Sequence, residues 1–258
     1  MIGKATNNIN FKAGLSSNAI ILQHKVDCKR IEALFYSKQN ITANFSNNKP
    51  LALAVFIANN IIEFLNKNFN FLRLFAPSIN VYNPKDLLLD KNLYHFCLPD
   101  NRMVLKNNLE YKAGSIFYQN INNLEELDLQ REQAYKLGLK GSNHFLADIL
   151  HEMMHSTYLK IIFDKCNKQS LDKQDLLFKL QNKTLNSQEN KIIKDVLGTE
   201  ATRSINQYHE IFAETFSDII CSSISNESYL PLNNPIHNLK QYPKEFLKVL
   251  QKVINIEL

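Results

Sequence analysis

The residues best suited to chemistry in this sequence are His151, Glu152 and His155, which form a His-Glu-x-x-His pattern. Side chains four positions apart lie on the same face of a helix, so both imidazoles can bind one metal ion. Catalytic zinc sites combine three protein ligands with a water molecule, and a carboxylate beside the first histidine can accept a proton from that water. The pattern therefore predicts one zinc ion per chain, bound by His151 and His155, with Glu152 as the general base.

The sequence around the pattern predicts a helix over residues 143–163. Ser142 and Asn143 are residue types that cap helix N-termini. Apolar residues follow at helical spacing: Phe145, Leu146, Ile149, Leu150, Met153 and Met154. A capped, apolar helix is the structural context that the metal-binding interpretation requires.

A third protein ligand is expected from a second predicted helix, residues 202–223, which has neither Gly nor Pro. Glu210, Glu214 and Asp218 stack on one face of this helix. A buried row of carboxylates needs a cation or histidine partners to offset its repulsion, and the zinc ion would be that cation. Asp175 is an alternative third ligand, although an aspartate at the start of a helix is more often a cap.

The combination of His-Glu-x-x-His with the later segment Glu210-Ile-Phe-Ala-Glu214 resembles the gluzincin metallopeptidases. Within them it is most similar to the lethal-factor-like peptidases and the Pro-Pro endopeptidases. The resemblance covers the two motif helices. It implies that Glu210 is the third zinc ligand, and that Glu214 supports a ligand histidine through a hydrogen bond, an arrangement that fixes the orientation of the imidazole.

The chain departs from that family at the residue that polarises the scissile carbonyl. The family has a tyrosine two helical turns before the ligand glutamate, and this chain has Arg203 there. Tyr208, which is closer to the ligand glutamate, and Tyr158, one turn after the second motif histidine, are the candidates for this role. His209 is a further candidate if it faces the site, although it points about 100 degrees away from its neighbour Glu210 around the helix.

Composition limits the other classes of function. The chain has 258 residues, of which 45% are hydrophobic and 21% charged, which is typical of a globular protein. The net charge is +5, but lysines alternate with acidic residues along predicted helices, so we expect no nucleic-acid surface. The four cysteines are far apart and predict neither a zinc knuckle nor a disulfide framework. No apolar run is long enough to span a membrane, and the first thirty residues lack a secretory apolar region.

The predicted fold class is α+β and zincin-like, with a small mixed β-sheet packed on the motif helix and a mainly helical C-terminal half. We expect a flexible segment over residues 1–24 and a single domain over 25–258, with strands in 50–122 and helices in 123–258. Short segments rich in β-formers, bounded by turn residues, predict the strands, which are residues 79–82, 94–98, 103–105 and 115–119. Pro99-Asp100-Asn101 predicts a hairpin turn. Residues 115–119 are the candidate edge strand at the rim of the cleft, where a substrate peptide can pair.

These observations predict a zinc-dependent endopeptidase with a protein or peptide substrate. One alternative is a non-catalytic protein-binding module on a zincin scaffold, although Glu152 has no use in a purely structural metal site. Another is an amidase that acts on a non-protein amide. The resemblance to toxin peptidases implies a bacterial effector, made in the cytoplasm without a Sec signal peptide and delivered by a specialised secretion system to a host cell.

Overall fold

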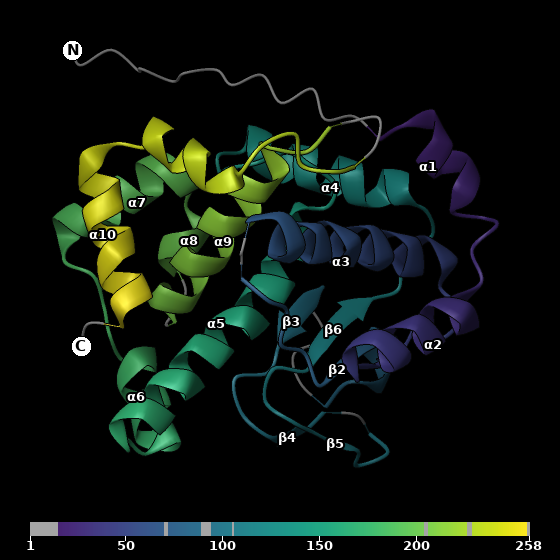
Figure 1. Cartoon of the computed structure of the whole chain (residues 1–258), viewed down its shortest axis with the longest axis horizontal. Helices are drawn as coiled ribbons and strands as arrows, with labels where there is room; N and C mark the ends of the chain where they lie inside the picture. Colours follow the sequence, from purple (N-terminus) through teal and green to yellow (C-terminus); the bar gives the residue numbers. More distant parts are fainter. Residues whose placement is uncertain are drawn as a thin grey trace.

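The computed structural model describes residues 15–69, 72–88, 94–104, 106–203, 206–225 and 229–256, and shows a mixed α+β fold with mostly helical content and a small mixed sheet (Figure 1). The α-helices are α1 Ser17–Leu22, α2 Cys28–Gln39, α3 Lys49–Phe69, α4 Leu124–Lys136, α5 Ala147–Gln169, α6 Lys173–Gln181, α7 Ser187–Leu197, α8 Glu200–Arg203, α9 Gln207–Cys221 and α10 Lys244–Asn255. The strands are β1 Thr42–Asn44, β2 Ser78–Tyr82, β3 His95–Cys97, β4 Arg102–Met103, β5 Glu110–Tyr111 and β6 Ile116–Gln119, and two 3-10 helices are η1 Pro84–Asp86 and η2 Pro235–Gln241.

Part of the segment predicted to be flexible is helical. Residues 1–14 lie outside the described residues, but α1 follows directly, with Ser16 as its N-cap. The buried side chain of Gln23 accepts a hydrogen bond from the backbone N–H of Leu124 at 2.7 Å. Residues 15–24 are therefore held to the start of α4.

The main sheet has the strand order β1-β2-β6-β3, in which β1, β2 and β6 are parallel and β3 is antiparallel to β6. The expectation that residues 115–119 form the edge strand is wrong, because β6 pairs with a strand on each side and its first three residues are buried. Such an apolar run is typical of an interior strand. The strand at the end of the sheet beside α5 is β3.

The hairpin predicted at Pro99-Asp100-Asn101 is also wrong. The strand before it, β3, pairs with β6, and the strand after it, β4, pairs with β5 in a separate two-stranded sheet. Asn101 instead accepts a hydrogen bond from the backbone N–H of Ala113 at 2.8 Å. The turn residues therefore connect two sheets, and the non-local pairing of β3 is what brings it beside α5.

Side chains alternate across β3, as in any strand. His95 contacts α5 through Asp148 and Glu152, whereas Phe96 stacks on Phe117 with 4.8 Å between ring centroids. Phe96 thus belongs to a small apolar cluster on the far face of the sheet, together with Tyr82, Leu87, Leu98, Val104, Tyr111 and Phe117. The strand is anchored on one face and presents a polar side chain to the motif helix on the other.

The motif helix α5 lies between α9 on one side and β3 and β6 on the other (Figure 1). Its residues from Ala147 to Leu159 are nearly all buried, which is typical of a helix surrounded by other elements. It begins four residues later than predicted, and neither Ser142 nor Asn143 caps it. The Ser142 hydroxyl instead accepts from the backbone N–H of His144, whose Nδ1 accepts from the N–H of Leu146, so these residues form a turn before the helix.

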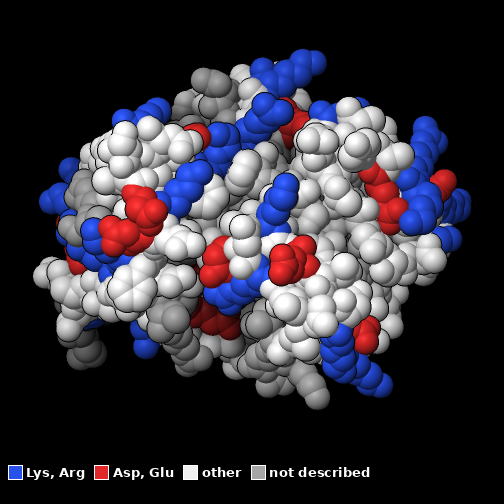
Figure 2. Space-filling model, turned by 90° about the horizontal axis from the view of Figure 1, so that it is seen from below, with Lys and Arg blue, Asp and Glu red and all other residues white. Residues whose placement is uncertain are grey.

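The second predicted motif helix, residues 202–223, is divided into α8 and α9, and residues 204 and 205 between them lie outside the described residues. None of the described helices combines the length and apolar character that a bilayer crossing requires. The face seen in Figure 2 carries both positive and negative side chains.

Candidate metal centre and cleft

The two motif histidines and Glu210 converge on one point. The Nε2 atoms of His151 and His155 are 2.8 Å apart, because one helical turn of α5 separates their backbones. Glu210 of α9 places Oε2 at 3.3 Å from His151 Nε2 and Oε1 at 3.5 Å from His155 Nε2. Among the described residues, these three side chains form a group whose donor atoms all lie within 4.8 Å of one another.

The donor set fits a zinc ion. Two imidazole nitrogens and one carboxylate oxygen are the ligand types of catalytic zinc sites, which keep a fourth position open. Zinc–nitrogen bonds of about 2.0 Å in tetrahedral geometry separate two ligand atoms by about 3.3 Å. The two Nε2 atoms are 2.8 Å apart, and each lies 3.3 or 3.5 Å from a different oxygen of Glu210, so all three separations are within about 0.5 Å of that value. These three residues could therefore hold zinc with little rearrangement.

The carboxylate of Glu152 has two different oxygens. Oε1 lies 2.6 Å from Nδ1 of His95, and 3.9 Å from Nε2 of His151. Oε2 is buried and has no hydrogen-bond partner among the described residues. A buried carboxylate oxygen without a donor is costly, and here it belongs to a residue that lines the same cleft as the three candidate ligands. Glu152 is thus anchored through Oε1, which is also its oxygen nearest to His151.

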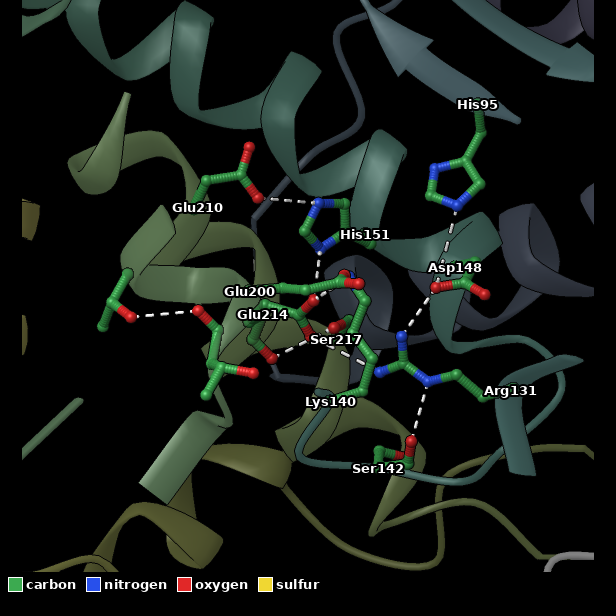
Figure 3. Close-up of polar contacts among 12 residues, drawn as sticks. His95, Arg131, Lys140, Ser142, Asp148, His151, Glu200, Glu210, Glu214 and Ser217 are labelled. Atoms are coloured by element: carbon green, nitrogen blue, oxygen red, sulfur yellow. Dashed lines mark hydrogen bonds and ion pairs between the residues drawn. The ribbon is translucent and has the colours of Figure 1, made fainter. Parts of the chain in front are cut away.

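Glu214 lies behind His151, as the second motif implied. Its Oε1 is 3.4 Å from His151 Nδ1, an ion-pair distance at which no well-aligned hydrogen bond forms. The side chain is completely buried and also contacts two cations, Lys140 at 2.5 Å and Arg131 at 3.4 Å (Figure 3). Burial raises the pKa of Glu214, but these two cations and His151 outweigh it and hold the pKa well below its usual range. The carboxylate that faces His151 is therefore ionised.

Asp218, one turn further along α9, has the opposite shift. Burial and the charge of Glu214 raise its pKa above the ordinary value, against the lowering effect of Arg131, which is 3.8 Å away. Lys140 and Arg131 have raised pKa values because their acidic partners outweigh burial. The row of carboxylates predicted on α9 is thus real, but arginine and lysine offset its inner part.

The two tyrosines expected to polarise a carbonyl lie elsewhere. The Tyr158 hydroxyl donates to the backbone carbonyl of Val253 at 2.7 Å, and its ring stacks on Phe212. Tyr208 is buried, and neither tyrosine lines the cleft. His209 does line it, with its ring centroid 6.0 Å from that of His155. Tyr208 and His209 lie on different faces of α9. The face that carries Tyr208 packs into the core, whereas His209 reaches the cleft.

The alternative ligand Asp175 is remote from this group. It lies in the first turn of α6, its backbone N–H donates to Asp172, and its exposed carboxylate pairs with Lys179 at 2.7 Å. Glu200 is partly exposed, lines the cleft and pairs with Lys140 at 2.8 Å. The geometry thus favours Glu210 over Asp175 as a third ligand.

The cleft encloses about 780 Å³ and is open to solvent. Its lining comes from β3 and the residues after it, from the two motif helices and from the segments before them: His95, Phe96, Cys97, Pro99, Lys140, His151, Glu152, His155, Leu159, Glu200, Asn206, His209 and Glu210. The candidate ligands and Glu152 therefore face a space that a substrate can enter.

His95, Arg131 and Lys140 are the contributors to the site that the sequence reasoning missed. A signal was available for Arg131, because it continues the buried face of α4 begun by Leu124 and Leu127, where an apolar residue is expected. A buried arginine at such a position indicates acidic partners elsewhere in the fold. For His95 the signal was weak, because only the pairing of β3 at the sheet edge brings it to Glu152.

Comparisons with protein-family models, with curated proteins and with solved structures gave no match to this chain. The gluzincin resemblance and the zincin-like fold therefore stay predictions, carried by the motif residues and by the geometry of the site.

Proposed function

We propose that this protein is a zinc-dependent endopeptidase of the gluzincin type, with zinc held by His151, His155 and Glu210 and with Glu152 as general base. The observation that carries the proposal is the convergence of two imidazoles and a carboxylate beside Glu152, which lines the same cleft and is anchored by His95. A structural metal site has no need for such a base. A bound zinc ion would acidify a water molecule in the open position.

Glu152 would accept the proton of the attacking water and then deliver it to the leaving amine. His95 holds Oε1 at 2.6 Å and so restricts rotation of the carboxylate. With both tyrosines outside the cleft, His209 is the candidate donor to the developing negative charge on the carbonyl oxygen, because its ring lines the cleft beside His155.

An extended peptide is the substrate class that the cleft favours. Tyr94 and Leu98 exchange backbone hydrogen bonds with β6, through Gln119 N–H to Tyr94 O and Leu98 N–H to Ser115 O. Backbone groups alternate in direction along an antiparallel strand, so those of His95 and Cys97 point away from β6. Among the described strands β3 has no second partner. A peptide strand can therefore pair with this edge, directly beside Glu152, and this favours a peptide over a non-protein amide.

The test is cleavage of a proteome-derived peptide library by the zinc-loaded protein, compared with Glu152→Gln and with Glu200→Gln. Removal of a general base typically costs about 10²–10⁴-fold in rate, so Glu152→Gln is expected to retain zinc and lose cleavage. Glu200→Gln makes the same chemical change in the same cleft, without contact to the ligands, and is expected to cleave. Zinc binding by the wild type without any cleavage would instead favour a binding module. Equal cleavage by Glu152→Gln would refute the assignment of the base.

A further inference from the structure

A single buried arginine connects the two halves of the candidate active centre. Arg131 comes from α4, outside both motif helices, and its side chain is inaccessible to solvent. Its Nε donates to the backbone carbonyl of Ser142 at 2.7 Å, Nη1 donates to Asp148 at 2.6 Å, and Nη2 lies 3.4 Å from Glu214 (Figure 3). The guanidinium therefore contacts α5 through Asp148 and α9 through Glu214, the two helices that carry the candidate ligands.

Each of the two carboxylates leads on to a histidine of the cleft. Glu214 lies 3.4 Å from Nδ1 of His151, a candidate metal ligand. Asp148 lies 3.8 Å from Nε2 of His95, whose other nitrogen is 2.6 Å from Glu152, the candidate base. One branch of contacts thus ends at the metal ligands and the other at the base, and both begin at the same guanidinium.

We propose that Arg131 is a positioning residue that sets the orientation of His151 through Glu214 and of Glu152 through Asp148 and His95. This inference rests on the proposed function. A guanidinium is suited to this role because its planar fork can hold two carboxylates in fixed relative directions, whereas an ammonium acts as a point charge. Outer contacts of this kind typically change metal affinity by about 10–100-fold when they are lost.

Lys140 provides an internal comparison, because its direct ion pairs reach only the Glu214 branch. It contacts Glu214 at 2.5 Å and Glu200 at 2.8 Å, and no contact joins it to His95 or Glu152 among the described residues. Loss of Lys140 therefore removes a contact of Glu214 and leaves the pair of Asp148 with Arg131 in place.

The experiment compares Arg131→Met and Arg131→Lys with Lys140→Met and Asp148→Asn in the full-length protein. Zinc affinity is measured by competition with a chelator, and kcat and KM are measured at saturating zinc on a peptide that the wild type cleaves. Lys140→Met should weaken zinc binding by about 10-fold or more and recover its kcat at saturating zinc. Asp148→Asn should keep zinc affinity and lose kcat, since misplacement of a reacting group by about 1 Å can cost about 100-fold.

Arg131→Met should show both losses, and Arg131→Lys should restore part of the zinc affinity and less of kcat. Gln23→Ala is the control for stability. It removes one buried and one partly buried hydrogen bond at the start of α4, and Gln23 contacts none of the partners of the guanidinium. If its Tm falls as far as that of Arg131→Met, Gln23→Ala should still keep the zinc affinity and the kcat of the wild type. If the Arg131 variants do not fold, Lys140→Met and Asp148→Asn still test whether one branch acts on zinc affinity and the other on kcat.

The outcomes separate this inference from the proposed function. A wild type that binds zinc and cleaves peptides, with Arg131 variants that match the Gln23→Ala control in both readouts, would overturn the positioning role and leave the peptidase intact. Identical effects of Lys140→Met and Asp148→Asn on zinc affinity and on kcat would also overturn the positioning role and leave the peptidase intact. A wild type that neither binds zinc nor cleaves any peptide would overturn both proposals.

Discussion

Zinc should stabilise the folded protein strongly, and the size of the effect can be estimated from the site. The ligand group brings together atoms of two helices, α5 and α9, and is formed only in the native state. A ligand that binds only the native state at about 1,000 times its Kd stabilises it by about 4.1 kcal/mol. For a chain of 258 residues, roughly 2–4 °C in Tm corresponds to each kcal/mol. Zinc at that level is therefore expected to raise Tm by about 8–16 °C.

Glu210→Gln should remove most of this stabilisation. It replaces a charged ligand by a neutral amide, and since loss of an outer contact alone costs up to about 100-fold in affinity, loss of a ligand should cost at least that. The same zinc concentration then corresponds to about ten times Kd, which leaves about 1.4 kcal/mol and a Tm increase of roughly 3–6 °C. Asp175→Asn is the matched control, because Asp175 is the rival ligand by spacing and is exposed on α6.

The assay is thermal unfolding followed by circular dichroism or calorimetry, with the metal-free protein titrated with zinc and with magnesium. Magnesium should have little effect, because it prefers an all-oxygen environment. An equal zinc-dependent Tm increase in the wild type and in Glu210→Gln would refute the three-ligand site. If only Asp175→Asn loses the zinc-dependent increase in Tm, the third ligand is Asp175 of α6.

Three further predictions concern residues around the site. Tyr158→Phe should lower the free energy of unfolding by about 1–2 kcal/mol, because the carbonyl of Val253 loses a buried partner, and should leave kcat unchanged. A large loss of kcat without a change in Tm would instead indicate that Tyr158 acts in catalysis. Burial lowers the pKa of His144 to about 4, so the folded state keeps this ring neutral, and stability should fall as pH drops below about 6.5, by about 2 kcal/mol at pH ~5. Denaturant unfolding at several pH values should show this dependence reduced in His144→Asn. Gly141→Ala should cost about 1–3 kcal/mol in the same denaturant assay, because the added methyl group would meet the carboxylate of Asp218, and wild-type stability would contradict that packing.

The parts of the fold that the sequence predicted well depend on local patterns. Helices were predicted over residues 123–258, and α4 to α10 lie there, because apolar residues recur at helical spacing in this half of the chain. Helical spacing also predicts that Glu210, Glu214 and Asp218 share a face of α9, and the resemblance selects Glu210 among them as the third ligand. Spacing could not show the rotation of that face, and this is why Tyr208 was expected in the cleft and lies in the core.

The parts that failed depend on contacts between distant segments. Strand pairing at β3 joins residues about twenty positions apart, and no local signal distinguishes it from the hairpin that the turn residues suggested. The cap expected before α5 failed because Ser142 is engaged by Arg131 through its carbonyl and by His144 through its hydroxyl. Residues that look like a helix start were thus used for a turn that holds a buried arginine.

The row of carboxylates on α9 was predicted from the sequence, but the cations that the fold places beside it were not. Repulsion along Glu210, Glu214 and Asp218 predicts a cation or histidine partners nearby, and zinc was the cation expected from the sequence. In the fold, Arg131 and Lys140 both contact Glu214, and Arg131 lies 3.8 Å from Asp218. Glu210 is the carboxylate that lies near the Nε2 atoms of both imidazoles. Because the inner part is balanced by the protein's own cations, α9 can pack against α5 before any metal binds, and the carboxylate left over is the one available to a metal ion.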